Sequence, residues 1–465
     1  MQTLKLKEIV AFTKAELLQG NLDLKVKEIV IDSRDVKTGF LFIAIIGQNK
    51  DGHQYLKEAV KNGASAVIVD RNSPAIQAAY PNLSVLKVED TTKALQAIAF
   101  NYRHKFDDLK VIGITGSAGK TTTKDMIFSV LSEKYYCLKT EGNYNNQIGL
   151  PLTLLRLDGR EDFAILEMGM SGLAEIDLLA KIAVPEIGII TNIAAAHLEQ
   201  LGSLENIAQA KKELIDNLTA ADTAILNYDN QYTKKIGTNS KAQTIYFGFE
   251  KGADARIENY FFNSKTETLK FEFTYQAKNY KFIFNKAGKH NLYNILPALI
   301  IAFKYKLKPE EIQKGLLKTK FSSLRMEFIQ LKNKARIIND CYNANPLSVK
   351  AALDVLEQIK AKRKIAILAS MLELGEKSLK KHQQIGLYAA AKKIDLLITI
   401  GPKAQAIATK ARTKMKSEQV INLANNKECI DFLLSEIKAE DLILIKGSRA
   451  NKLEEIVDEL KSKEL

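Results

Sequence analysis

The chain of 465 residues has little cysteine and lacks any long apolar segment. Its three cysteines, Cys137, Cys341 and Cys429, lie far apart without C-x-x-C spacing, so we expect neither a disulfide framework nor a zinc site. No run of about 18 apolar residues indicates a membrane span, and the N-terminal MQTLKLKEIV lacks the continuous apolar stretch of a signal peptide. We therefore expect a cytoplasmic protein with reduced thiols and no membrane span.

A concentrated basic region is also missing, although the formal net charge is +14. The lysines are scattered, and only short clusters such as KAKRK at residues 360–364 occur. Nucleic-acid binding is usually marked by a basic patch, whereas a dispersed positive field suits a small anionic substrate equally well. We expect no nucleic-acid partner.

The order of apolar segments predicts an α/β protein of about three domains, without internal repeats. Residues 1–88 form a small α/β unit by pattern, and residues 89–318 alternate strands with helices as in a parallel sheet. Within the second unit, residues 269–284 alternate at period two, which indicates an inserted antiparallel flap. Residues 319–465 again follow a doubly wound pattern.

The stretch VIGITGSAGKTTTKDM, residues 111–126, has the features of a phosphate-binding loop between a strand and a helix. Gly116 and Gly119 permit a tight turn, Lys120 can neutralise phosphate charge, and the hydroxyl of Thr121 is a candidate Mg²⁺ ligand. The usual G-x-x-x-x-G-K-[ST] spacing requires glycine at position 114, where this chain has Ile114. The predicted nucleotide-binding loop residues are Gly116, Ser117, Ala118, Gly119, Lys120, Thr121 and Thr122.

Three further residues in the second unit are candidates for the same site. Glu167 and His197 follow apolar strand segments, so both are expected at the sheet edge beside the loop. Lys211 completes the apolar stripe of a predicted helix at 203–218, and a desolvated lysine tends to lose its proton and become nucleophilic. Alone, the glutamate is equally well a solvated strand end, the histidine a structural residue, and the lysine a side chain that snorkels from a partly buried face.

Taken together, these segments resemble the Mur ligase family, the ATP-dependent amide-forming enzymes of peptidoglycan synthesis. The similarity rests on the phosphate loop and on GKHNLYNILPALIIA, SSLRMEFIQ, INDCYNANPLSVKAAL, TEGNYNNQIGLP and DSRDVKTGFLFIAIIGQNKDGH, in the family's order. It implies a UDP-sugar-binding N-terminal domain, a central ATP-binding domain and a Rossmann-like C-terminal domain. Domain closure about residues 318–323 is expected, because the implied ATP contacts come from two domains.

The resemblance also implies roles for individual residues. Lys211 would be carbamylated and would hold a second Mg²⁺ with His197, while Thr121 and Glu167 would hold the first. Asn294 would read adenine through its amide, and Pro297 is expected to kink the same helix. Arg325 and Asp340 would contact the ATP phosphates and ribose; the implied substrate-binding residues are Ser33, Arg34, Asn143, Asn145 and Asn146. In ordinary proteins the asparagines could equally be helix caps or parts of a polar loop.

DCYNANP at 340–346 and LIKGSR at 444–449 resemble the family member that joins D-alanyl-D-alanine to UDP-N-acetylmuramoyl-tripeptide. We therefore expect this reaction, with ATP and two Mg²⁺ ions, in a monomeric enzyme. The alternatives are another amide ligase of this superfamily, either amino-acid-adding or folylpolyglutamate-synthase-like, and a nucleotide-dependent switch or nucleic-acid-stimulated ATPase. Whether the third peptide residue is meso-diaminopimelate or lysine stays open.

Overall fold

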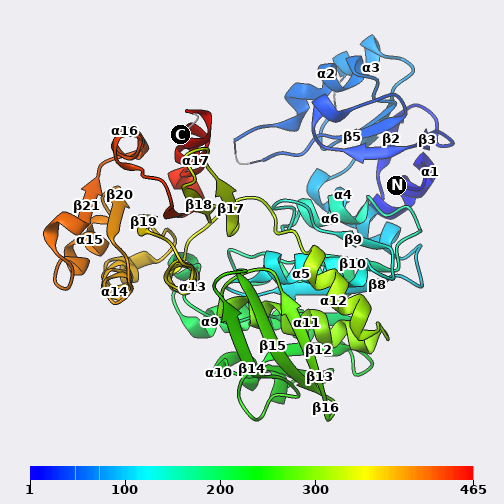
Figure 1. Ribbon diagram of the computed structural model, residues 1–465. Coiled ribbons are helices and arrows are strands. Elements are labelled where there is room, and N and C mark those ends of the chain that lie inside the picture. The colour runs from blue at the N-terminus through cyan, green and yellow to red at the C-terminus, as the bar shows by residue number, and fades with distance from the viewer. Residues whose placement is uncertain (48, 73, 464–465) are drawn as a thin grey trace.

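The computed structural model describes residues 1–47, 49–72 and 74–463, and contains three α/β units that follow one another along the chain (Figure 1). Each unit has its own mainly parallel sheet covered by helices. The predicted α/β class is confirmed. No helix among the described residues is both long and apolar enough to cross a membrane.

The N-terminal unit contains a five-stranded sheet in the order β2-β7-β6-β5-β4, and β1 pairs separately with β3. Strands β5 and β6 are apolar and almost fully buried, as expected for strands covered on both faces. The strands are β1 (Leu4–Lys5), β2 (Glu16–Gln19), β3 (Lys25–Val26), β4 (Glu28–Val30), β5 (Phe40–Ile43), β6 (Ala66–Val69) and β7 (Ser84–Lys87). The helices are α1 (Leu6–Thr13), α2 (Leu56–Lys61) and α3 (Pro74–Ala79).

Helix α4 (Thr91–Arg103) connects the first two units. Asp90 caps its N-terminus, and its apolar face packs against helices of both units. At its C-terminal end the Tyr102 hydroxyl donates to the carbonyl of Leu157, and the Arg103 guanidinium donates to that of Ala183. The domain boundary after residue 88 stays a prediction, because α4 belongs to the core of both sides.

The central unit is built on a nine-stranded sheet in the order β16-β15-β14-β13-β12-β11-β8-β10-β9. Its strands are β8 (Lys110–Thr115), β9 (Cys137–Lys139), β10 (Phe163–Glu167), β11 (Ile187–Ile190), β12 (Thr223–Asn227), β13 (Gln243–Gly248), β14 (Ala255–Asn263), β15 (Thr268–Tyr275) and β16 (Lys278–Phe284). The predicted antiparallel strands exist as β15 and β16, but they are not a separate flap. They continue the central sheet, because β14 pairs in parallel with β13 and antiparallel with β15.

Helices cover both faces of this central sheet, with one apolar core on each side. Helices α5, α11 and α12 pack on one face, where α11 and α12 lie beside α5 (Figure 1). Helices α6, α7 and α9 pack on the other face. The predicted kink at Pro297 does not end α11, which continues to Lys304. The helices are α5 (Lys120–Leu131), α6 (Gly149–Leu154), α7 (Glu175–Ala183), α8 (Leu198–Leu201), α9 (Leu204–Asp216), α10 (Gln231–Thr238), α11 (Lys289–Lys304) and α12 (Pro309–Lys318).

The C-terminal unit has a six-stranded sheet in the order β17-β18-β22-β19-β20-β21, parallel except for the edge strand β17. Its strands are β17 (Glu327–Gln330), β18 (Arg336–Asn339), β19 (Arg363–Ala369), β20 (Leu396–Ile400), β21 (Val420–Leu423) and β22 (Asp441–Lys446). Its helices are α13 (Pro346–Gln358), α14 (Ser378–Ala390), α15 (Gln405–Ala411), α16 (Asn426–Glu436) and α17 (Glu454–Ser462). Helix α13 begins at a regular N-cap, since the Asn345 side chain accepts from the Ser348 N–H and Pro346 is the first helical residue.

Candidate active site

The phosphate loop lies between β8 and α5, as the sequence predicts. Gly116 has φ +149° and Gly119 has φ +84°, and a Cβ on Gly116 would lie 1.9 Å from the Thr191 hydroxyl oxygen. Both glycines are therefore favoured by backbone conformation and by space, since a Cβ on Gly119 would lie 2.3 Å from Asn294 Oδ1. Ile114 is buried within β8, where it pairs with Glu167 and Ile189 on the neighbouring strands. Glycine is absent at 114 because this position belongs to the strand rather than to the loop.

Polar side chains from the segment after β11 fix the loop's conformation. The Asn192 side chain accepts from the Ala118 N–H at 3.0 Å and donates to the Ala118 carbonyl at 2.9 Å. The Thr191 hydroxyl donates to the same carbonyl at 2.6 Å, and the Ser117 hydroxyl donates to the carbonyl of Ala194 at 2.9 Å. Sequence reasoning missed Asn192, although an amide directly after a buried strand is a usable signal.

Lys120 begins α5 and folds back over the loop, where its ammonium donates to the Gly116 carbonyl at 2.9 Å. Desolvation lowers the pKa of Lys120, while the nearby carboxylate of Glu167 opposes this effect. A lysine held here can act as a point charge toward phosphate oxygens.

A hydroxyl and a carboxylate meet at the start of α5. The Thr121 hydroxyl donates to Glu167 Oε2 at 2.7 Å, and Glu167 is buried at the end of β10. The Asn145 side-chain amide donates to Glu167 Oε1 at 2.9 Å, so this predicted substrate residue contacts the carboxylate in the structure. The oxygen donors of Thr121 and Glu167 beside a phosphate loop fit the hard-ligand preference of Mg²⁺.

Lys211 is buried in α9, with 2% of its surface exposed, as the apolar stripe predicts. Desolvation, reinforced by the positive charge of Lys120, holds the pKa of Lys211 well below its usual value. Its neighbour Lys212 points to solvent and pairs with Asp216. Among the described residues, none forms a hydrogen bond or ion pair with the Lys211 amine that would stabilise its charged form.

His197 lies between β11 and α8 with a left-handed backbone, φ +57°. Its Nδ1 is 2.7 Å from Glu373 Oε2, which comes from the C-terminal unit, and His197 lowers the pKa of Glu373. Glu373 also has a left-handed backbone, φ +62°, and its carbonyl accepts from the Glu199 N–H. Strained residues of this kind often occur at functional sites. Sequence reasoning missed Glu373, because the contact joins segments that are remote along the chain.

A cavity of about 780 Å³ separates the central and C-terminal units. Of the predicted nucleotide residues, it is lined by Ser117, Ala118, Gly119, Lys120, Thr121, Thr122, Asn294, Arg325 and Asp340. Residues from the two domains thus meet around one space, as predicted. The two units also touch directly, because the Asn345 side chain donates to the Ser117 carbonyl at 3.2 Å.

The C-terminal wall of the cavity holds its charged groups by specific contacts. The Arg325 guanidinium lies 4.1 Å from the ring centroid of Tyr342, a cation–π arrangement that fixes its plane. The buried Lys446 forms an ion pair with Asp340, and its ammonium also donates to the Asn343 carbonyl at 3.0 Å. Lys446 was not singled out from the sequence, although it ends the strand β22 and lies in LIKGSR.

The remaining predicted substrate residues lie outside this cavity. Ser33 is buried and donates to Glu58 at 2.6 Å, whereas Arg34 is exposed and its hydrogen bond to Asp32 lowers the pKa of that carboxyl to about 2. The Asn146 side chain accepts from the N–H of Gly149, the first residue of α6, at 2.8 Å. These contacts show local structural roles, and the assigned substrate roles of Ser33, Arg34, Asn143 and Asn146 stay predictions.

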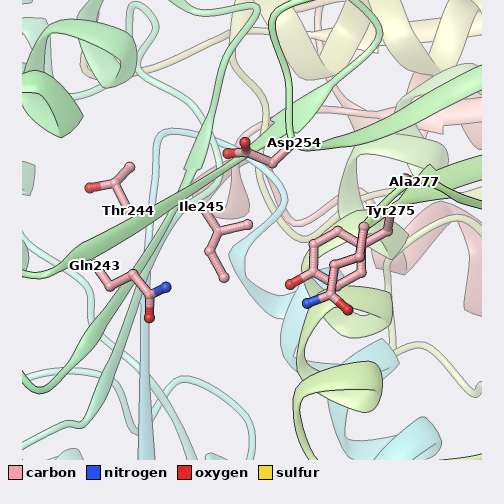
Figure 2. A pocket seen from close by; sticks show the side chains of 7 residues that line it. Gln243, Thr244, Ile245, Asp254, Tyr275 and Ala277 are labelled. Carbon is pink, nitrogen blue, oxygen red and sulfur yellow. The ribbon is translucent and has the colours of Figure 1, made fainter.

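A second hollow of about 420 Å³ lies among β13, β14 and the β15–β16 turn (Figure 2). Its lining includes Gln243, Asp254 and Tyr275, and no predicted site residue. Asp254 accepts from the Tyr246 N–H at 2.7 Å, so the carboxylate supports the sheet. The larger cavity is therefore the candidate active site.

The fold and the site define a phosphate-loop protein with a cavity between two α/β domains. Residues 25–103 match the Mur ligase family catalytic domain, residues 114–302 the Mur ligase middle domain, and residues 324–449 the Mur ligase glutamate ligase domain. The chain belongs to the Mur ligase family.

Individual relatives are similar over nearly the whole chain. The UDP-N-acetylmuramoyl-tripeptide--D-alanyl-D-alanine ligase of Bacillus subtilis (strain 168) is 36% identical over 453 residues, which cover 96% of this chain and 97% of that protein. The crystal structure of MurF from Acinetobacter baumannii superimposes with a TM-score of 0.90 at 30% identity and covers 99% of both chains. MurF ligase from Thermotoga maritima, solved in complex with ADP, has a TM-score of 0.82 at 27% identity and covers 94% of this chain and 98% of that chain.

Proposed function

We propose that this protein is an ATP-dependent ligase that joins D-alanyl-D-alanine to the terminal carboxylate of UDP-N-acetylmuramoyl-tripeptide. One observation of the structure supports the use of ATP: the phosphate loop, Asn294, Arg325 and Asp340 line a single cavity between two domains. The substrates follow from the names of relatives such as the Bacillus subtilis ligase, with which the chain aligns almost end to end.

The reaction begins when the tripeptide carboxylate attacks the γ-phosphorus of ATP, which breaks the bond to the β-phosphate oxygen and releases ADP. The product is an acyl phosphate. The free amine of the dipeptide then attacks the acyl carbon, phosphate leaves, and the amine loses a proton. Since the carboxylate and the triphosphate are both anionic, the site must chiefly neutralise charge and hold the reactants in line.

Lys120 and Arg325 both line the cavity and supply positive charge to it, Lys120 from the phosphate loop and Arg325 from the start of the C-terminal unit. Lys120 can move from the Gly116 carbonyl to phosphate oxygens, because its four-carbon stem is flexible. Thr121 and Glu167 would hold a Mg²⁺ ion, which supplies charge neutralisation and orientation of the phosphates when bound. Asn294 would read the adenine edge, and Asp340 the ribose.

Lys211 is proposed to carry a carbamate that completes a second Mg²⁺ site with His197. The support is chemical: burial, reinforced by the charge of Lys120, holds the pKa of the amine well below its usual value, which favours the neutral, nucleophilic form that reacts with CO₂. Without the carbamate, the described residues contain no cluster of three or more histidine, cysteine, aspartate or glutamate side chains able to hold a metal. A carbamate would supply the missing anionic oxygens.

The substrate side of the proposal rests on the N-terminal unit and the loop after β9. Ser33, Arg34, Asn143, Asn145 and Asn146 are proposed to contact the UDP-sugar peptide, with Asn145 also supporting Glu167. We also propose a monomer that acts in the cytoplasm, where ATP is available. The third residue of the accepted peptide remains either meso-diaminopimelate or lysine.

The decisive experiment measures phosphate release from ATP with each UDP-muramoyl-tripeptide and D-alanyl-D-alanine, and identifies the amide product by mass. We expect phosphate and amide in equal amounts with one tripeptide preferred. An amide product only with a single amino acid, or with a folate substrate, would favour a different ligase of the family. ATP hydrolysis stimulated by DNA without any amide product would contradict the ligase assignment.

A further inference from the structure

Two buried charged residues, Lys124 and Asp125, lie one turn after the phosphate loop and have no part in the reaction described above. Lys124 is 0% exposed and Asp125 is 1% exposed. Charges buried this deeply are costly unless each is paired and hydrogen-bonded. Their contacts therefore indicate what the pair holds in place.

Asp125 holds the start of the linker to the C-terminal domain. Its Oδ2 accepts from both the backbone N–H and the hydroxyl of Ser322, at 2.9 and 2.8 Å. Its Oδ1 accepts from the Lys139 ammonium at 3.0 Å and lies 3.4 Å from that of Lys124. The linker at Ser322 is thereby attached to α5, the helix that begins at the phosphate loop.

Lys124 extends the same attachment toward the metal side of the site. Its ammonium donates to the Thr140 carbonyl at 2.8 Å, and the Thr140 hydroxyl accepts from the Glu167 N–H at 3.0 Å. The pair thus connects the linker, the loop that begins at residue 140 and the strand end carrying Glu167. These three segments are therefore held together by hydrogen bonds and ion pairs to side chains of α5.

Two residues beyond Ser322, the chain is attached to the other domain. The Tyr342 N–H donates to the Leu324 carbonyl at 3.1 Å, and the Met326 N–H donates to Asp340 Oδ1 at 3.2 Å. Leu324 and Met326 both have left-handed backbones, φ +61° and +46°, so the chain turns sharply here. Arg325 lies between them and must move with the C-terminal domain.

We propose that Asp125 is a positioning residue that fixes the pivot between the two domains at Ser323. Ser322 stays with the phosphate loop, whereas Arg325 and Asp340 move as part of the C-terminal domain. Because the free linker between the attachments is so short, the two walls of the ATP cavity can meet in only a narrow range of arrangements. This proposal rests on the proposed function where it is tested by the rate of ligation, whereas the arrangement of the domains can be measured without ligation.

The test compares Asp125→Asn, Ser322→Ala and the matched control Ser323→Ala. Ser322→Ala removes one hydrogen bond to Asp125 and leaves the buried lysine contacts intact. It therefore still tests the proposal if Asp125→Asn fails to fold. We expect kcat to fall about tenfold in Asp125→Asn and about threefold in Ser322→Ala, with the KM for the UDP-tripeptide within about twofold of wild type. Ser323→Ala, on an exposed side chain, is expected to match wild type.

Small-angle scattering with saturating ADP supplies the readout that needs no ligation. The Ser322→Ala and Asp125→Asn proteins are expected to be more expanded than wild type and Ser323→Ala, at unchanged circular dichroism. Wild-type scattering and wild-type kinetics in Ser322→Ala would overturn the proposal. A uniform loss of ADP affinity, thermal stability and kcat without expansion would also overturn it, since that pattern marks a purely structural residue. Failure of wild type to ligate would instead count against the proposed function, and the scattering result would still test the pivot.

Discussion

Gly119→Ala tests whether the phosphate loop and Asn294 form one site. Gly119 has φ +84°, and a Cβ placed on it would lie 2.3 Å from Asn294 Oδ1. An alanine pays about 1–2 kcal/mol for the left-handed backbone. An ordinary contact needs more than about 3 Å, so the buried Asn294 amide must also move, and overpacking of this kind costs about 1–3 kcal/mol.

Gly202→Ala separates these two contributions. Gly202 has φ +72°, close to that of Gly119, but its added Cβ would meet no atom within 4 Å. The control therefore carries the backbone cost alone. The difference between the variants, about 1–3 kcal/mol, corresponds to a roughly 5- to 150-fold loss of ATP affinity if the displaced Asn294 reads adenine.

Isothermal titration of ATP and ADP into wild type and both variants measures this difference, with thermal unfolding as the check on folding. We expect Gly202→Ala to bind nucleotide like wild type and Gly119→Ala to bind at least fivefold more weakly. Equal nucleotide affinity in the two variants would refute the reasoning, because the contact with Asn294 would then contribute nothing to the site.

Two other substitutions test assigned roles, and a third tests the burial of His290, which lines the larger cavity. Lys120→Ala is expected to lower kcat by about 10²–10³ in the phosphate-release assay, since it removes a fixed positive charge at the γ-phosphate, and near-normal turnover would contradict that role. Lys211→Ala is expected to be inactive and partly restored by a short carboxylic acid, while normal activity would exclude the carbamate. Desolvation lowers the pKa of His290 to about 4, below the usual 6.5, so the unfolded chain takes up this proton first and stability falls as the pH drops from about 6.5 to 4. Between about pH 6.5 and 4 the unfolding free energy of wild type should therefore fall by about 2 kcal/mol more than that of His290→Gln. Urea denaturation at each pH measures this difference, and identical pH profiles of the two proteins would contradict the prediction.

The local elements of the site were predictable because they depend on short patterns. The strand KVIGIT, the two loop glycines and the apolar stripe around Lys211 each signal their structure within a few residues, and each lies where predicted. Glu167 and Thr121 could be paired because parallel strands bring their carboxyl ends to one edge. The two-residue strands β1 and β3 carry no periodic signal, so they could not be found.

Contacts between domains were not predictable in the same way. The pairing of His197 with Glu373 depends on how two independently patterned units pack, and neither segment contains a signal for the other. Lys446 has the pattern of an ordinary strand-end lysine, and only the fold shows that it pairs with Asp340.

Strand β14 was missed for a different reason. Its middle residues are exposed, so it lacks the alternation of buried and exposed residues that marks β15.

The central helix α5 explains why the proposed base-reading and phosphate-binding residues stay close together. Helix α12 approaches it through Gly315, where a Cβ would lie 2.6 Å from the Val130 Cα, and the Ser129 hydroxyl donates to the Gly315 carbonyl at 2.7 Å. Helix α11 packs along α5 as well, and its Asn294 accepts from the Thr123 hydroxyl at 3.4 Å. Because α5 is held by the sheet on one side and two close-packed helices on the other, the spacing between Lys120 and Asn294 is set by core packing. We therefore expect the C-terminal domain to close on a central half-site whose geometry is already fixed, with Arg325 and Asp340, beyond the linker, as the groups that move.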